Sequence, residues 1–106
     1  MHIQVVTFNL LGLSEAEFSK ACVEVFAPAF AGVSGLISKV WLGNPETNTY
    51  GGVYTWRNRE AMERYANSEL FQSIVENPRL VNIRSEDFSV MEEPTRITHG
   101  LTLSAP

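Results

Sequence analysis

The stretch Gly35–Arg57 constrains the fold of this chain more than any other, because its pattern is that of a β-hairpin. Two runs rich in β-branched and aromatic residues, Leu36–Leu42 and Tyr50–Trp56, flank the segment GNPETNT, whose composition is typical of a turn. Side chains two residues apart in a strand share a face, so pairing Gly43 with Tyr50 separates the hairpin into two surfaces. We therefore expect the other elements to pack around this unit.

The two surfaces of the hairpin differ in the size of their side chains. One surface is small and aliphatic and consists of Leu36, Ser38, Val40, Leu42, Gly51, Val53 and Thr55. The other is largely aromatic and consists of Ile37, Lys39, Trp41, Gly52, Tyr54 and Trp56. We expect helices to cover the aliphatic surface. The aromatic surface would then lie on the open side of the sheet, where a partner subunit or a ligand covers it.

The N-terminal third predicts a strand followed by a helix. Ile3–Leu10 alternates and is rich in β-formers, and Asn9 is its one side chain with clear hydrogen-bonding reach into a pocket. Ser14 and Glu17 form a capping box at the start of the helix. We expect Pro28 to kink this helix or to end it early. The side chains expected to face the sheet are Phe18, Cys22, Val25 and Ala29.

The C-terminal half predicts two short helices and a last strand. Asn58 is an expected N-cap for the helix Arg59–Ala66, whose inward residues would include Tyr65, and Ser68 would cap a further turn or two. Leu80–Met91 has the pattern of a long strand. The remaining segment, Glu92–Pro106, carries apolar residues, and we expect it to lie along its own sheet or along a partner subunit.

The predicted order β-α-β-β-α-β is that of a ferredoxin-like α+β fold. A chain of 106 residues is expected to form a single domain, residues 1–106. This fold places both helical segments on one face of a four-stranded sheet and leaves the other face bare. Pairing of two sheets in a homodimer is the expected solution.

Composition limits the partners. The net charge of −4 has no offsetting cluster of basic residues, so nucleic acid is not expected to bind. No apolar run is long enough to cross a membrane and no signal-peptide pattern is present, so a cytoplasmic protein without membrane contact is expected. Cys22 is the only cysteine, and His2 and His99 lack accompanying ligands. No metal site is therefore predicted.

Several motifs resemble those of the YdhR-type family of proposed monooxygenases, in the dimeric α+β barrel superfamily related to the antibiotic biosynthesis monooxygenases. The matching segments are SKVWLGNPETNTYGGVYTW, with Lys39-Val40-Trp41 and Gly51-Gly52, and the following NREAMERY. A weaker similarity continues through Glu93-Pro94 to Ile97. The resemblance covers most of the chain, and it is more specific for the family than for an activity.

The resemblance implies a homodimer with a small pocket in each subunit. Some relatives are cofactor-independent monooxygenases that deprotonate a phenolic substrate and let its anion pass an electron to oxygen. By this analogy we expect no cofactor and a small aromatic or phenolic ligand. The residues expected to hold and polarise the substrate, as catalytic residues, are Asn9, Trp41 and Tyr54. The residues expected to bind it are Lys39, Trp56 and Tyr65.

Two other functions stay open at this point. The same aromatic side chains could form the interface of a non-catalytic, small-molecule-binding or stress-responsive dimer. An isomerase acting by proton transfer is a third class, although no histidine or carboxylate is placed to move the proton. Haem degradation is disfavoured, because relatives with that activity usually carry an axial histidine on the second helix and Arg59–Asn77 contains none.

Overall fold

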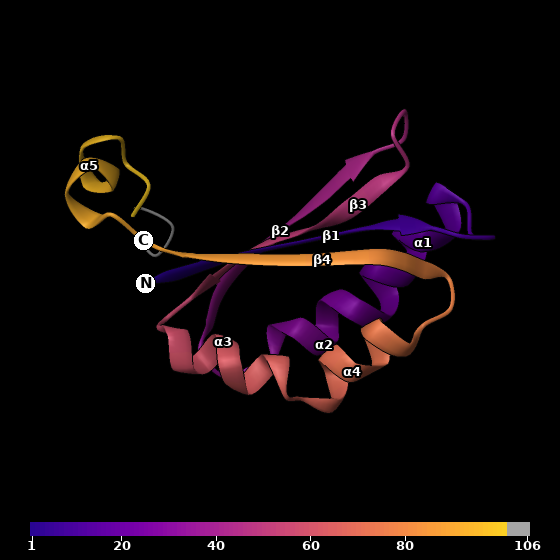
Figure 1. Ribbon diagram of the computed structural model, residues 1–106, viewed down its shortest axis with the longest axis horizontal. Helices are drawn as coiled ribbons and strands as arrows, with labels where there is room; N and C mark the ends of the chain where they lie inside the picture. The colour runs from indigo at the N-terminus through magenta and orange to yellow at the C-terminus, as the bar shows by residue number, and fades with distance from the viewer. Residues whose placement is uncertain (102–106) are drawn as a thin grey trace.

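The computed structural model describes residues 1–101. They form a four-stranded antiparallel sheet with most of its helices on one face (Figure 1). The strands lie in the order β2-β3-β1-β4. Their bounds are β1 His2–Leu10, β2 Leu36–Asn44, β3 Thr49–Trp56 and β4 Leu80–Ser89. Strands β2 and β4 are therefore the two edges, and the hairpin's β3 lies inside the sheet.

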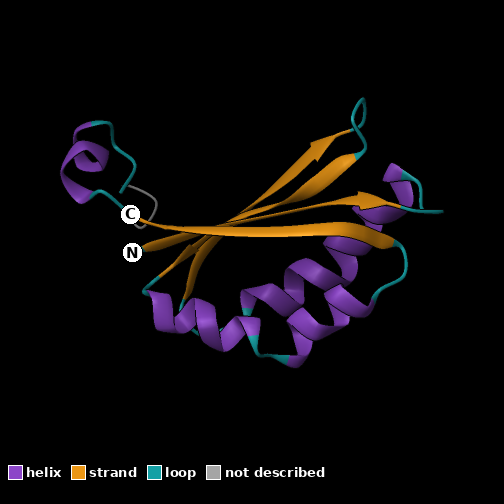
Figure 2. Cartoon of the chain, viewed as in Figure 1, coloured by secondary structure: helices purple, strands orange, loops and turns teal. Residues whose placement is uncertain are grey.

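Most of the helical residues cover one face of this sheet (Figure 2). The helices on that face are α1 Glu15–Ala21, η1 Cys22–Phe26, α2 Ala27–Ala31, α3 Arg59–Ala66 and α4 Glu69–Glu76. A last helix, α5 Glu92–Ile97, lies beyond the end of the sheet, on its other side. Apart from α5, the arrangement confirms the predicted ferredoxin-like α+β order.

Side-chain caps fix where these helices begin. The Ser14 hydroxyl accepts a hydrogen bond from the Glu17 amide, and the Glu17 carboxylate accepts one from the Ser14 amide, which is the predicted capping box. Asn58 caps α3 through the Ala61 amide, and Ser68 caps α4 through the Phe71 amide. These caps satisfy donors that have no partner within the helix.

The register predicted for the hairpin is confirmed over most of its length. Gly43 lies opposite Tyr50, and Lys39 lies opposite Tyr54. A bulge shifts the register at Ile37, so that Leu36 lies opposite Trp56. Ile37 is consequently exposed instead of joining the aromatic surface as expected.

The predicted orientation of the hairpin is wrong. Tyr54 and Trp56 are buried at 2% and 0% exposure, beneath α2 and α3, while Val40 on the aliphatic surface is 56% exposed on the bare face. The physical reason is volume. Large rings fill the space between the sheet and the helix layer better than the small side chains of the opposite surface.

The first helical segment departs from regular α-helix ahead of Pro28. Residues Cys22–Phe26 form a π-helix, and the Ala27 amide donates to the Cys22 carbonyl, five residues back. A proline has no N–H to give and its ring crowds the preceding turn, so the wider π turn accommodates it without the expected early stop. The extra residue per turn directs Phe26 and Phe30 inward, whereas the 3.6-residue period had predicted Val25 and Ala29.

The C-terminal segment runs beside the bare face near the start of β1. The strand β4 ends at Ser89, two residues before the predicted end. The Val90 amide donates to the Met1 carbonyl at 3.2 Å. Met91 and Leu101 line a cavity that also includes Ile3, on the bare face. This agrees with the expectation that the segment follows its own sheet, and residues 102–106 lie outside the described part.

Candidate functional site

Lys39 lies in a cage of aromatic rings between the sheet and the helices. Its Nζ is 3.4 Å from the centroid of Phe30, 3.5 Å from that of Trp41 and 4.5 Å from that of Tyr54. We call these four residues the Lys39 cage. The structure thus brings together three of the six predicted site residues, Lys39, Trp41 and Tyr54.

Three elements build the Lys39 cage. Lys39 and Trp41 leave β2 on the helix-facing side, Tyr54 comes from the paired position on β3, and Phe30 descends from α2. Gly52 provides the space, since a Cβ at this position would lie 2.7 Å from the Lys39 Cε. Without a side chain there, the lysine stem crosses β3 and reaches the rings.

The Lys39 amine is unusually easy to deprotonate. Burial lowers its pKa from the usual 10.5 to about 7, because an apolar cage solvates the ammonium poorly. The ring faces oppose this shift in part, since they attract the cation. At neutral pH about half of the molecules therefore hold a neutral amine at this position, which is able to accept a proton.

Tyr54 and Tyr65 form a buried phenol pair behind this amine. Their hydroxyl oxygens are 3.5 Å apart. Burial raises the pKa of Tyr54 to about 12 and raises the pKa of Tyr65 further, because neither phenolate would be solvated. Both hydroxyls stay protonated at physiological pH. They can donate hydrogen bonds, and neither can act as a base.

Two cavities adjoin the amine. The inner one is about 20 Å³, enough for one water molecule, and is largely apolar. A more open one of about 230 Å³ lies on the outer side. Its lining residues are Ala27, Phe30, Ala31, Leu36, Ile37, Ser38, Lys39 and Trp41. The second cavity is smaller than the usual pocket for a drug-sized ligand, which limits an occupant to about one ring.

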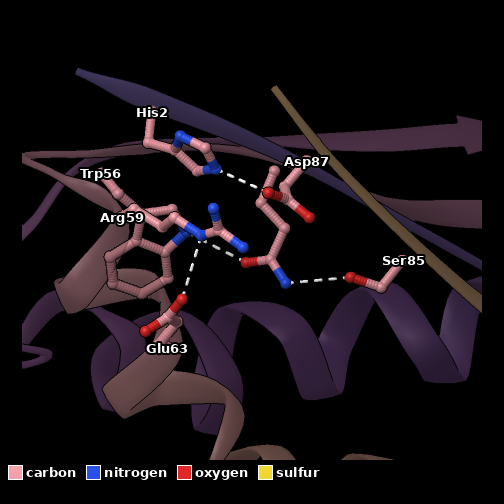
Figure 3. A network of polar contacts seen from close by, with 7 residues as sticks. His2, Trp56, Arg59, Glu63, Ser85 and Asp87 are labelled. Atoms are coloured by element: carbon pink, nitrogen blue, oxygen red, sulfur yellow. Dashed lines mark hydrogen bonds and ion pairs between the residues drawn. The ribbon is translucent and has the colours of Figure 1, made fainter. Parts of the chain in front are cut away.

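Trp56 and Tyr65 form the rear wall of the cage. Trp56 stacks on Tyr54 at 5.9 Å and 5°, and neither Trp56 nor Tyr65 lines the two cavities beside Lys39. The Trp56 indole donates to the Gln4 amide oxygen at 3.0 Å, and Gln4 in turn donates to Ser85 (Figure 3). Direct substrate contact, as predicted for Trp56 and Tyr65, does not fit this placement.

The same end of the sheet carries a further hydrogen bond, between His2 and Asp87. Nε2 of His2 lies 2.7 Å from a carboxylate oxygen of Asp87 (Figure 3). A carboxylate only accepts, so this nitrogen is the donor. The pair joins the start of β1 to β4, close to Trp56 and away from the cage.

The structure does not bring Asn9 to the other site residues. Asn9 lies on the bare face of β1, and its amide nitrogen donates to the Asn48 carbonyl at 2.7 Å. Its amide oxygen accepts from Asn82 at 2.9 Å. Asn48 and Asn82 both have positive φ, at 51° and 55°, in the hairpin turn and in the bulge of β4. Asn9 therefore ties together two irregular segments.

A depression of about 440 Å³ lies on the bare face around Asn9, Asn82 and Arg84. It is polar and open, and its asparagine side chains bind one another. The Lys39 cage is the better candidate for chemistry, because a desolvated titratable group and apolar walls occur together there.

Residues 1–101 contain neither a grouping of side chains typical of a metal site nor a helix typical of a membrane span. No group of three or more histidine, cysteine, aspartate or glutamate side chains in this range is arranged to hold a metal ion. None of the helices described there has the length and apolar character needed to cross a bilayer. Cys22, the first residue of the π-helix η1, is partly buried, and burial raises the pKa of its thiol.

The sequence matches the family model described as "Putative mono-oxygenase ydhR" over residues 3–101. The chain belongs to this family. Among curated proteins, none matches it.

Solved structures with the same fold include relatives of several activities. An antibiotic biosynthesis monooxygenase candidate from Deinococcus radiodurans is 16% identical, with a TM-score of 0.70 over 87% of this chain and 94% of that one. A mutant of SnoaB, a cofactor-independent oxygenase from Streptomyces nogalater, is 19% identical, with a TM-score of 0.67 over 86% and 93%. The haem degrader MhuD from Mycobacterium tuberculosis, solved with two haems, is 18% identical, with a TM-score of 0.68 over 86% and 96%.

Sequence reasoning missed two members of this site. Phe30 was not predicted because the π-helix shifts the helical face, although the four-residue spacing of Phe18, Cys22, Phe26 and Phe30 was available as a signal. Gly52 was assigned to the aromatic surface and to a family motif but was not expected to shape the site. Its position opposite Trp41 and beside Lys39 indicated that a long side chain could cross the strand there.

Proposed function

We propose that the Lys39 cage binds a small phenol and activates it towards dioxygen without a bound cofactor. The observation that carries this proposal is the Lys39 amine, with a pKa of about 7, held between the rings of Phe30 and Trp41. A general base works best when its pKa lies near the working pH. Family membership supports the reaction class, and the cavity of about 230 Å³ supports a one-ring substrate.

In this proposal the amine and two rings of the cage have separate tasks. The phenol ring lies against Trp41 and Phe30, and its hydroxyl gives a proton to the neutral Lys39 amine. The phenolate then stays paired with the new ammonium, in a site where little water screens the charges. The electron-rich ring transfers an electron to oxygen. Conversion of a phenol to a para-quinone consumes one O₂ and releases one H₂O, so no external reductant is needed.

The test is oxygen uptake and quinone absorbance with a panel of monocyclic phenols, using the wild type and three variants. We expect Lys39→Met to lower the rate by about 10²–10⁴-fold, because the base is lost. Lys39→Arg should be equally poor, since a guanidinium keeps its proton. Lys20→Met, at the only other lysine, should retain the rate. Wild-type oxygen uptake in Lys39→Met would refute the proposal.

The Asn9→Ala variant tests whether Asn9 contributes to the reaction, as predicted from the sequence, or only to the stability of the fold. Since Asn9 lies on the opposite face, we expect the oxidation rate to be retained while the free energy of unfolding falls by about 1–2 kcal/mol through two lost hydrogen bonds.

A small-molecule-binding protein without catalysis would give another pattern. Phenols would raise the melting temperature of the wild type but not of Lys39→Met, and no oxygen would be consumed.

We also propose that the chain forms a homodimer through the bare face. Val40, Leu42 and Phe88 expose 56%, 37% and 53% of their surface there. Arg84 and Glu86 carry opposite charges at neighbouring positions of β4 on the bare face, on the same side as Phe88. A face with apolar side chains and both signs of charge is complementary to itself, as a two-fold interface requires.

Analytical ultracentrifugation tests this interface. Sedimentation should give a dimer for the wild type and a monomer for Val40→Glu, because a buried carboxylate would face the partner subunit. An unchanged dimer would exclude this face.

A further inference from the structure

The Lys39 amine is a nucleophile as well as a base, and its surroundings suit a covalent reaction. Its Nζ lies over two ring faces at 3.4 and 3.5 Å. Among residues 1–101, no carboxylate pairs with it, whereas Arg59 and Arg96 pair with glutamates. Without a carboxylate partner, the charged form of the amine is favoured only by the ring faces and by the nearby Cys22 thiol when that thiol is ionised, and burial outweighs both.

We infer that Lys39 forms a reversible imine with small aromatic aldehydes. The nitrogen lone pair attacks the carbonyl carbon, which makes a C–N bond and a tetrahedral carbinolamine. Loss of the carbonyl oxygen as water then gives the C=N bond. Two protons from the nitrogen leave with that oxygen, no electrons are transferred, and no co-reactant is needed. This reaction is separate from phenol oxidation and does not depend on it.

The cage accounts for the aldehyde class. A benzene ring bound beside Nζ could stack on Trp41 or Phe30, which a linear aliphatic aldehyde cannot do as well. The cavity of about 230 Å³ opens on the outer side of Lys39, where Ala27, Ala31 and Ser38 present small side chains. The aldehyde enters from that side. The apolar inner side keeps water from the imine, which slows hydrolysis.

The chain contains its own control for reactivity. Its only lysines are Lys20 and Lys39, so the three amines are those two and the α-amino group of Met1. With a pKa of about 7, Lys39 has roughly 10³ times the neutral fraction of an ordinary lysine at neutral pH. Lys20 lies exposed on α1 and serves as the ordinary lysine. The α-amino group also reacts near neutrality and must be counted separately.

The experiment traps the imine with cyanoborohydride on the full-length protein, under anaerobic conditions at neutral pH. Benzaldehyde and butanal are the probes, and peptide mapping by mass spectrometry locates the label. We expect benzaldehyde to label Lys39 at least tenfold faster than it labels Lys20. We also expect Lys39 to be labelled faster by benzaldehyde than by butanal. In concentrated urea the two lysines should label equally, because the cage is gone.

Three results would overturn this inference. Equal labelling of Lys39 and Lys20 in the folded protein would show that Lys39 is an ordinary amine. Equal labelling of Lys39 by benzaldehyde and butanal would remove the aromatic class. Undiminished labelling of Lys39 in folded Gly52→Ala would show that the cage geometry is irrelevant, because the new Cβ would displace the lysine stem. Since trapping needs no oxygen, its failure is distinguishable from failure of the phenol reaction.

Discussion

Replacing Trp56 with alanine should cost about 3–5 kcal/mol of unfolding free energy, the largest loss expected from any change in the aromatic cluster. Trp56 has 0% exposure, stacks on Tyr54 at 5.9 Å and packs at a tilt against Tyr65 at 5.2 Å. The substitution would open a cavity at the centre of the helix–sheet interface. It would also leave the Gln4 amide oxygen without its donor, which adds a desolvation cost.

The matched control is Trp41→Ala. Trp41 is only partly buried and faces the cavity beside Lys39, so its loss should cost about half as much and should raise the pKa of Lys39 by wetting the cage. Urea denaturation followed by far-ultraviolet circular dichroism measures both variants without depending on tryptophan emission. Equal losses of unfolding free energy for the two variants would contradict the separate roles assigned to Trp56, in the rear wall, and Trp41, beside the cavity.

The contrast between these tryptophans shows what the sequence could and could not predict. Alternation with a period of two assigned Trp41 and Trp56 correctly to one surface of the hairpin and set the register of Lys39 against Tyr54. A period of two says nothing about which surface meets the helices, because both surfaces of this hairpin are apolar enough to be buried. Only the fit of ring volumes to the helix layer decides it, and that depends on Phe30 and Tyr65 in other elements.

Two further features were hidden for local reasons. The π-helix ahead of Pro28 changes the helical period, so that the expected inward positions Val25 and Ala29 are exposed. Asn9 was expected in the pocket from its chemistry alone. Its actual partners, Asn48 and Asn82, are 39 and 73 residues away in the sequence, and only the folded sheet brings them together.

Helix caps, by contrast, depend on residues close in sequence. The caps Ser14, Asn58 and Ser68 were all predicted from the sequence for this reason.

The free energy of unfolding of the wild type, minus that of Lys39→Met, should rise by about 1–3 kcal/mol between pH 7 and about pH 9.5. In the folded protein the pKa of Lys39 is lowered to about 7, whereas in the unfolded chain the lysine titrates near 10.5. Above pH 10.5 the amine is neutral in both states and burial costs nothing through its charge. As the pH falls from 10.5 to 7, the unfolded chain takes up a proton that the folded chain does not. The free energy of unfolding therefore falls progressively over this range. Well below pH 7 both states are protonated, and the destabilisation caused by burying the ammonium is constant.

Urea denaturation of the wild type, Lys39→Met and Lys20→Met at both pH values measures this difference. Subtracting the Lys39→Met values removes the contributions of all other titrating groups, and Lys20→Met should show no pH-dependent difference from the wild type. A flat difference for Lys39→Met would mean that attraction by the ring faces of Phe30 and Trp41 fully offsets desolvation. Lys39 would then be a permanent cation at neutral pH. It could still bind a phenolate, but it could neither accept the phenol's proton nor attack an aldehyde, so one equilibrium measurement bears on both proposed reactions.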